Sequence, residues 1–219
     1  MNLTAEQHDA ITELINIAFA RTAKSLSDIT GFHVMLDVPA MKLDPLGDLI
    51  PQLASQMANQ DVATIQQTFT GQLSGTAMLL LDYNTAVSIT DLVTVGYTPY
   101  RHHLDHASGE VLTEVGNILL NACLSSLGNL LKLHLCFSMP RLQLRSVESI
   151  PDALALNAMG HQYTLSVCTQ FRLQNVSING YLVLVLEETA LAQLLSAIDR
   201  WVDQPIHLPI RLPSVAGQK

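Results

Sequence analysis

Charged side chains are scarce in this sequence of 219 residues, at 14%, and aromatic side chains make up only 5%. Acidic residues outnumber basic ones, since eleven Lys and Arg against nineteen Asp and Glu give a formal net charge of −8. A protein that binds the phosphate backbone of a nucleic acid needs a basic surface, so nucleic acid is not an expected partner. Hydrophobic residues reach 48%, with a mean hydropathy of +0.28, which indicates a folded chain with a substantial core.

Cysteine is also rare, with three residues, Cys123, Cys136 and Cys168, that form no Cys-x-x-Cys pair. Each lies in an apolar stretch, which predicts buried, reduced thiols and a cytoplasmic protein. The first residues lack the basic and apolar regions of a signal peptide, and no stretch approaches the roughly 18 uninterrupted apolar residues of a membrane span. We therefore expect neither export nor a membrane partner.

An order of predicted elements occurs twice along the chain. In the first half, the patterns predict a long helix over 5–29 capped by Thr4, a short strand over 32–38 ending at Pro39, a short helix over 46–57, strands over 63–70 and 75–81, and a helix to about 95 that is capped by Asn84 or Thr85. In the second half, they predict a long helix over 109–132 capped by Ser108, a strand over 133–138 closed by Pro140, a short helix over 150–158, strands over 162–174 and 179–186, and a helix over 188–201.

The two predicted hairpins decide the fold class. Hairpin strands run antiparallel, so we expect an α+β protein rather than a parallel doubly wound one. The expected architecture is a single pseudo-two-fold domain over 1–202, with a mixed or antiparallel sheet built from repeats at about 5–96 and 108–202 and the long helices packed on it. Residues 203–219 contain three prolines and few core residues, which predicts an extended C-terminal tail.

Both long predicted helices carry the same polar pattern. An acidic residue, a glutamate and an asparagine lie at positions i, i+4 and i+7: Asp9, Glu13 and Asn16 on the first helix, and Glu110, Glu114 and Asn117 on the second. Each trio therefore shares one helix face, and the first trio lies opposite an apolar stripe that includes Ile15 and Ala18. In the second helix the expected apolar stripe comprises Val111, Val115, Ile118, Leu119, Ala122, Leu127 and Leu130.

The spacing to a proline is also repeated, because 22 residues separate Asn16 from Pro39 and 22 separate Asn117 from Pro140. A Glu-x2-Asn-x22-Pro match arises by chance in about one sequence of this composition in a hundred, and two matches in about one in ten thousand. Duplication makes the copies non-independent, so the second copy shows that the pattern was retained.

This doubled pattern resembles the CheC family of chemotaxis phosphatases, which includes CheX and the phosphatase domain of the flagellar switch protein FliY. The family motif is Asp or Ser, three residues, Glu, two residues, Asn, 22 residues and Pro. The copy that begins at Asp9 fits completely, whereas the second copy has Glu110 in place of the leading Asp or Ser. The first site is therefore the preferred one if only one site is active.

The resemblance implies hydrolysis of the aspartyl phosphate of a CheY-like response regulator. Asn16 and Asn117 would orient the attacking water, since a carboxamide has no titrating group and cannot act as a strong base. Glu13 and Glu114 would pair with a lysine of the regulator and anchor it. The Mg²⁺ is expected on the regulator, and this chain is expected to bind no cofactor or metal.

The remaining motif residues have supporting roles in this interpretation. Asp9 and Glu110 would bind the substrate or support the motif, and the longer side chain of Glu110 could either crowd the docking groove or be tolerated at its rim. Pro39 and Pro140 are expected to shape the ends of their strands through a fixed φ rather than to touch substrate.

Four questions stay open. The chain could be a non-catalytic binding module for a response regulator or for a CheD-like chemotaxis protein, and it could be a monomer or a homodimer. His102 and His106 could share a metal ion, although a polar loop before a helix explains them more simply. Each acidic trio could also be an ordinary solvated helix face.

Overall fold

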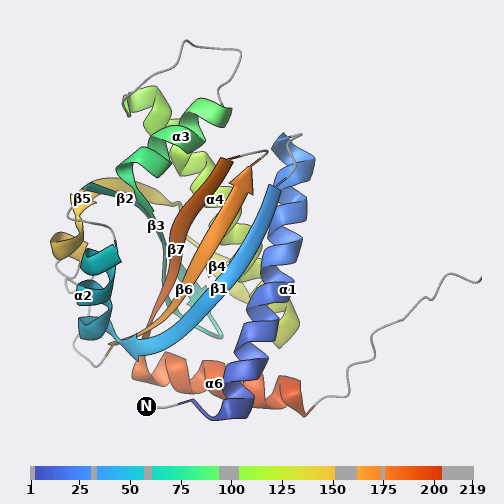
Figure 1. Ribbon diagram of the computed structural model, residues 1–219. Helices are drawn as coiled ribbons and strands as arrows, with labels where there is room; N and C mark the ends of the chain where they lie inside the picture. Colours follow the sequence, from blue (N-terminus) through green and yellow to red (C-terminus); the bar gives the residue numbers. More distant parts are fainter. Residues whose placement is uncertain are drawn as a thin grey trace, which may run out of the picture.

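The computed structural model describes residues 3–30, 34–56, 61–93, 104–150, 162–173 and 176–203. A seven-stranded sheet with helices on both faces forms the body of the protein (Figure 1). The first half contains α1 (Ala5–Thr30), β1 (Val34–Pro45), α2 (Leu46–Gln56), β2 (Asp61–Gly71), β3 (Gly75–Asp82) and α3 (Tyr83–Val93). The second half contains α4 (His106–Leu131), β4 (Leu135–Phe137), β5 (Arg141–Ser146), a 3₁₀ turn (Val147–Ser149), β6 (Gln162–Leu173), β7 (Val176–Glu187) and α6 (Glu188–Val202).

The α+β fold class is confirmed. The strand order is β1-β6-β7-β3-β2-β4, β5 also pairs with β2, and all these pairings are antiparallel. The predicted helix over 150–158 lies almost entirely outside the described residues, as does the tail beyond 203, so the domain boundaries stay a prediction.

The two halves exchange strands. β1 of the first half pairs with β6 of the second, and β4 and β5 of the second half pair with β2 of the first. β3 and β7 join the two hairpins at the centre of the sheet. Each hairpin edge is thus covered by a strand from the other half, which explains why the sheet is continuous.

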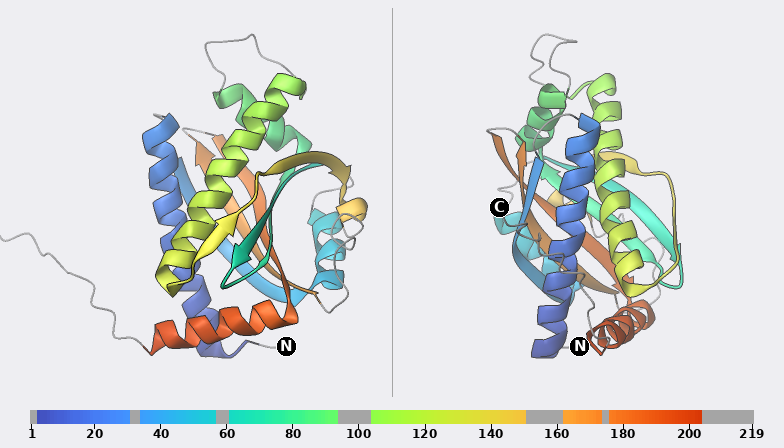
Figure 2. Two further views of the ribbon diagram at one scale, coloured as in Figure 1. Left: turned by 180° about the vertical axis from the view of Figure 1, so that it is seen from behind. Right: turned by 90° about the vertical axis from the view of Figure 1, so that its right-hand side faces the viewer.

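Two helices from different halves lie side by side on one face of the sheet. α1 and α4 run along this face, and α6 crosses one end of the sheet (Figure 2). Ile65 and Phe69 of β2 point to this side, into a core that also contains Leu14 and Leu120. The opposite face is covered by α2, whose Leu49 and Leu53 pack with residues such as Val62 and Leu80 in a second, smaller core.

β1 is longer than predicted, because it does not end at Pro39. The strand continues to Pro45, and its register against β6 shifts between Asp37 and Ala40, where β1 contains one extra residue. A proline removes one ladder donor, which an edge strand with a bulge tolerates. The position of β1 at the end of the strand order provides that tolerance.

Two predicted helix caps are wrong, and one is confirmed. Thr4 caps α1, since its Oγ1 accepts from the Gln7 N–H at 3.1 Å and its own N–H donates to Gln7 Oε1 at 3.2 Å. α4 begins three residues earlier than expected, and its cap is Asp105, which accepts from the Ser108 N–H at 2.8 Å. α3 is likewise capped by an aspartate, because Asp82 accepts from the Thr85 N–H at 2.8 Å.

The expected apolar stripe of α4 lies beside the centre of the buried face, and its members Val115, Ile118, Leu127 and Leu130 are partly buried against the main core. The fully buried residues of this helix are Ser108, Leu112, Gly116, Leu119, Leu120, Cys123, Leu124, Gly128 and Leu131, whereas Leu119 is the one member of the predicted stripe among them. Apolar residues surround most of this helix, so periodicity alone does not mark the face that packs on the sheet. By length and composition α4 could also cross a membrane, with a hydropathy of 1.3, a test that the core helix of a soluble protein passes as well.

Candidate active site

The first motif lies on the outer face of α1. Asp9, Glu13 and Asn16 are all exposed, whereas Ile15 and Ala18 on the other side of the helix are 2% and 0% exposed. Glu13 precedes Asn16 by one turn, so a carboxylate and a carboxamide are presented together. The capping box at Thr4 and the buried stripe fix the helix that carries them.

Pro39, the last residue of the first motif, lies within β1. Its side chain is outside the described part of the structure, so the contact between Pro39 and the trio on α1 stays a prediction.

The second motif lies on α4. Glu110 and Glu114 are exposed and Asn117 is half-buried. The structure brings both glutamates together with Pro140 around one open groove between α4 and β5. The proline that the sequence places 22 residues beyond Asn117 therefore returns to the glutamates of the same motif.

The rim of this groove (the α4–β5 groove) combines acidic, basic and apolar side chains. Its wall on α4 carries the two glutamates, and its wall on β5 carries Arg141 and Leu144. Leu144 is 46% exposed, and Met139, next to the groove, is 87% exposed. Exposed large hydrophobic residues beside complementary charges are typical of a surface that a protein partner covers.

Each leading acidic residue of the two motifs lies near a histidine. His8 Nδ1 is 3.7 Å from Asp9 Oδ1, and His106 Nδ1 is 3.6 Å from Glu110 Oε1. The longer Glu110 side chain reaches His106, one turn earlier on the helix, whereas the Asp9 carboxylate lies near the adjacent residue His8. Both pairs are exposed, so each contributes little to stability.

Three polar residues that the sequence analysis did not single out form a network behind Asn117. Asn121 Nδ2 donates to Asn117 Oδ1 at 2.6 Å, and Gln67 Nε2 donates to Asn121 Oδ1 at 3.0 Å. The same Gln67 Nε2 donates to the Ser138 carbonyl at 2.7 Å. The signal for Asn121 was its position one turn after Asn117 on the same helix, whereas Gln67 is 54 residues from Asn121 and becomes its neighbour only through the fold.

A tight turn brings the chain back to this network. α4 ends at Leu131, its C-cap residue Lys132 has a left-handed φ of 57°, and the Leu133 N–H donates to the Gly128 carbonyl at 2.7 Å. The following residue, His134, lies against Gly71, where a Cβ atom would be 2.3 Å from the His134 carbonyl oxygen. Glycine is required there because its φ is also 128°.

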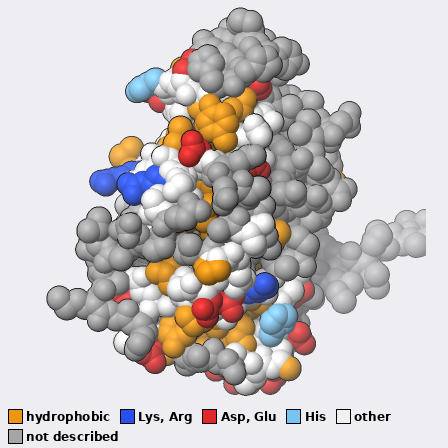
Figure 3. All heavy atoms as spheres, turned by 60° about the vertical axis from the view of Figure 1, so that its left-hand side comes forward, with side chains coloured by type: hydrophobic (Ala, Val, Ile, Leu, Met, Phe, Trp, Pro, Cys, Tyr) orange, Lys and Arg blue, Asp and Glu red, His pale blue; other side chains and the backbone are white. Residues whose placement is uncertain are grey.

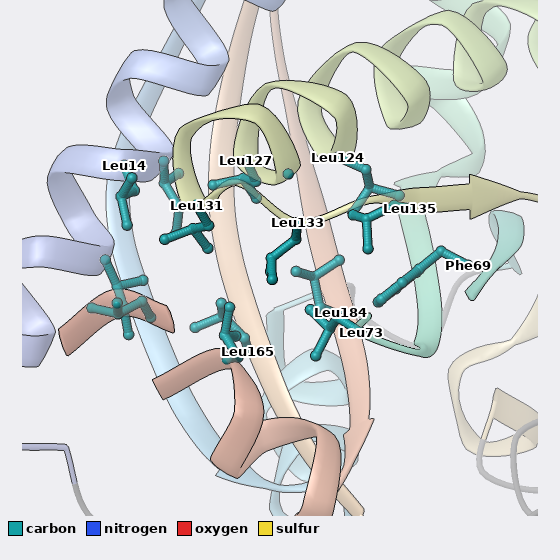
Figure 4. A pocket seen from close by; sticks show the side chains of 15 residues that line it. Leu14, Phe69, Leu73, Leu124, Leu127, Leu131, Leu133, Leu135, Leu165 and Leu184 are labelled. Carbon is teal, nitrogen blue, oxygen red and sulfur yellow. The ribbon is translucent and has the colours of Figure 1, made fainter. Parts of the chain in front are cut away.

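Other candidate sites have less support. Among the residues that the structure describes, no group of three or more His, Cys, Asp or Glu could hold a metal ion, and His102 and His103 lie outside them. The void between α1, α4, α6 and the sheet is lined by hydrophobic side chains and by Gly128, and measures about 30 Å³ (Figure 4). It is too small for a substrate, so it is a packing gap.

The three cysteines differ in burial. Cys123 is buried, Cys168 is half-buried and Cys136 is exposed, so the prediction of three buried thiols is wrong for Cys136. Cys136 lies on the short strand β4, where side chains alternate between the two faces. Burial raises the pKa of Cys123 to about 12.

The surface charge agrees with the composition. On the face shown in Figure 3, charged side chains lie in small groups among hydrophobic and uncharged ones, and the described side chains there form no broad basic patch. The expectation that nucleic acid is not a partner rests on this scarcity of positive charge.

Comparison with known proteins finds a relative with a similar sequence. No protein-family model matches the chain. It is 28% identical over 141 residues to the CheY-P phosphatase CheC of Bacillus subtilis, a match that spans 64% of this chain and 66% of CheC, just under two thirds of either protein. This sequence similarity to CheC agrees with the doubled motif on α1 and α4.

Solved structures show the fold of this CheC-like chain. The crystal structure of Thermotoga maritima FliY covers 92% of this chain and 100% of its own, with a TM-score of 0.75 and 20% identity. FliM from the FliG–FliM complex of H. pylori covers 89% of this chain, with a TM-score of 0.63 and 9% identity. At these identities both similarities establish architecture, and the activity has to be argued from the site.

Proposed function

We propose that this protein hydrolyses the aspartyl phosphate of a CheY-like response regulator. The observation that carries the proposal is the doubled motif, in which a glutamate and an asparagine one turn apart lie on the outer side of α1 and again on α4. The sequence similarity to the CheC phosphatase supports the same reaction. We place the protein in the cytoplasm, where response regulators act.

The chemistry requires little from the chain. An acyl phosphate is already activated, and the regulator supplies the Mg²⁺ that neutralises the phosphoryl oxygens, so the main need is a water molecule in line with phosphorus. Asn16 or Asn117 can hold that water, because a carboxamide both donates and accepts hydrogen bonds. Glu13 or Glu114, one turn earlier, is the carboxylate that would pair with a regulator lysine and set the register of the helix.

The α4–β5 groove supports docking at the second motif. Glu114, Arg141 and the exposed Leu144 all line this groove, so a regulator that covers it would bury both charged and hydrophobic surface. Pro140 lines the groove directly before β5, so its fixed φ would restrict the start of that strand.

The test is loss of acyl phosphate from a phosphorylated receiver protein in the presence of the purified chain. The wild type should accelerate decay, Asn16→Ala and Asn117→Ala should each lower the rate, and the double variant should reduce it to that of the receiver alone. Circular dichroism of each variant provides the folding control. Equal decay with the wild type and the double variant would contradict the proposal.

A second candidate function is a non-catalytic binding module for a response regulator or a CheD-like protein. The FliM-like fold favours keeping this candidate, because the same architecture occurs in a protein crystallised in complex with FliG. A binder would capture the phosphorylated receiver and leave its decay unchanged or slow it. The decay assay thus separates the two functions, and light scattering with and without receiver distinguishes a monomer from a homodimer.

A further inference from the structure

The network behind Asn117 begins at a fixed backbone carbonyl. Ser138 is tied to β2 twice: its N–H donates to the Thr68 carbonyl at 2.9 Å, and the Thr68 N–H donates to Ser138 Oγ at 3.0 Å. The Ser138 carbonyl accepts from Gln67 Nε2 at 2.7 Å. Ser138 precedes Pro140 by two residues, so the strand end next to the motif proline also supplies the first acceptor.

This carbonyl determines the direction of every later hydrogen bond. A backbone carbonyl can only accept, so the amide end of Gln67 that faces Ser138 must be its NH2 group. That NH2 group also lies 3.0 Å from Asn121, whose facing atom must then be the oxygen. The Asn121 NH2 group is left to donate to Asn117 at 2.6 Å, so the facing atom of Asn117 is again the oxygen. The NH2 group of Asn117 is the end that the network leaves for a ligand.

The carboxamides at the base of the network are held by the protein interior. Gln67 is 1% exposed, and its Oε1 has no hydrogen-bond partner among the described residues. Asn121 and Asn117 are half-buried. A buried glutamine with an unsatisfied oxygen costs about 1–3 kcal/mol, so this position is not optimised for stability alone.

Among the described residues of α1, no side chain behind Asn16 takes the place of Asn121. The residue one turn after Asn16 is Ala20, whose side chain cannot donate a hydrogen bond. Asn16 is exposed, whereas Asn117 is half-buried. The two motifs therefore contain the same residue types but differ in how far the asparagine is buried and hydrogen-bonded.

We infer that Gln67 and Asn121 are positioning residues of the second site, which fix the rotamer and the amide orientation of Asn117. This inference rests on the proposed phosphatase function. A carboxamide that is already oriented loses less conformational freedom when it holds a water molecule in line. The second lone pair of Asn117 Oδ1 stays available to accept from that water, and the NH2 group to donate to it or to a phosphoryl oxygen. The second site is thus the better organised one, although the first has the complete motif.

The experiment uses the two sites as controls for each other. In the Asn16→Ala variant the second site is the one that remains, and in the Asn117→Ala variant the first site is the one that remains. Asn121→Asp is then added to each background, because aspartate has the shape of asparagine and still accepts from Gln67 but cannot donate to Asn117. Asn121→Ala is made in parallel as a variant without charge.

The Asn121 variants are expected to lower kcat in the Asn16→Ala background and not in the Asn117→Ala background. In the second-site background, both Asn121 variants should lower kcat for receiver dephosphorylation roughly three- to tenfold, as expected for the loss of one neutral hydrogen bond, with KM within about twofold because Glu114 is unchanged. In the first-site background, kcat should not change. An unchanged kcat in the second-site background, or the same decrease in both backgrounds, would overturn the inference.

A measurement on the wild type tests the network without reference to activity. In ¹⁵N-edited NMR, the side-chain NH2 protons of Gln67 and Asn121 should exchange with water more slowly than those of Asn16. Exchange as fast as that of Asn16 would show that the network does not persist in solution and would overturn the inference. If the wild type does not accelerate receiver decay at all, the proposed function fails first and the inference fails with it.

Discussion

Replacement of Gly116 by alanine should weaken both the packing of α4 and the second site. Gly116 is buried against β2, and a Cβ atom there would lie 2.8 Å from Ile65 Cγ2, 3.0 Å from Cγ1 and 3.1 Å from Cβ. Ile65 is 0% exposed and presents its branch point, so it cannot swing away. The helix must therefore move away from the strand.

Two opposing effects set the change in stability. Alanine favours a helix over glycine by about 1 kcal/mol, whereas forcing a methyl group into a packed core costs about 1–3 kcal/mol. We expect Gly116→Ala to leave the free energy of unfolding unchanged or to lower it by up to about 2 kcal/mol. Gly109→Ala is the matched control on the same helix, since its Cβ would meet only Leu142 Cδ2 at 3.4 Å, and it should raise the free energy of unfolding by up to about 1 kcal/mol.

The same displacement should reach the hydrogen bond between Gln67 and Asn121. Moving the contact from 2.8 Å to an ordinary 3.4 Å requires a shift of about 0.6 Å, which would stretch the 3.0 Å bond to about 3.6 Å, beyond hydrogen-bond range. Urea unfolding of both variants, followed by circular dichroism, and receiver-phosphate decay in the Asn16→Ala background measure the two effects. The reasoning is refuted if Gly116→Ala stabilises the protein as much as Gly109→Ala and leaves second-site kcat unchanged.

Three further changes test other parts of the structure. Thr4→Ala removes the capping box of α1 and should lower the free energy of unfolding by about 1 kcal/mol in urea titrations; no change would mean that the cap is not formed in solution. Gln67→Met removes a buried unsatisfied oxygen together with two donated hydrogen bonds, so stability should change by less than about 1 kcal/mol while second-site kcat falls, and a fall in stability alone would contradict a positioning role. At pH 8 a thiol reagent should label exposed Cys136 rapidly and Cys123 only after unfolding. Because burial raises the pKa of Cys123 from 9.0 to about 12, its stabilising contribution is complete below pH 9 and is lost as the pH rises towards 12, so the free energy of unfolding should fall more steeply over that range in the wild type than in Cys123→Ala.

The elements with strong local signals could be predicted from the sequence. The predicted α1 ends within one residue of the observed helix, because Thr4 with Gln7 forms a local cap and the apolar stripe is narrow. Both hairpins and α6 were also predicted, because the periodicity of apolar residues in strands and helices is a local signal in the sequence.

What the sequence did not predict depends on contacts between distant segments. β5 was missed because six residues with two leucines form a weak pattern, and the strand exists through its pairing with β2. The cap of α4 was assigned to Ser108, which is instead buried and hydrogen-bonded to Asp105. The network behind Asn117 joins residues 54 and 71 positions apart, so no local pattern indicates it.

The exchange of strands between the halves has a consequence for how this protein can evolve. Gln67 belongs to the first half, yet it donates to Asn121, which in turn donates to Asn117 of the second motif. If Gln67 positions Asn117 as inferred, a mutation in the segment that encodes the first half changes the motif of the second half. After a duplication, the activities of the two sites could diverge without any change in the motif residues themselves. Each site therefore evolves together with the whole sheet that both halves build.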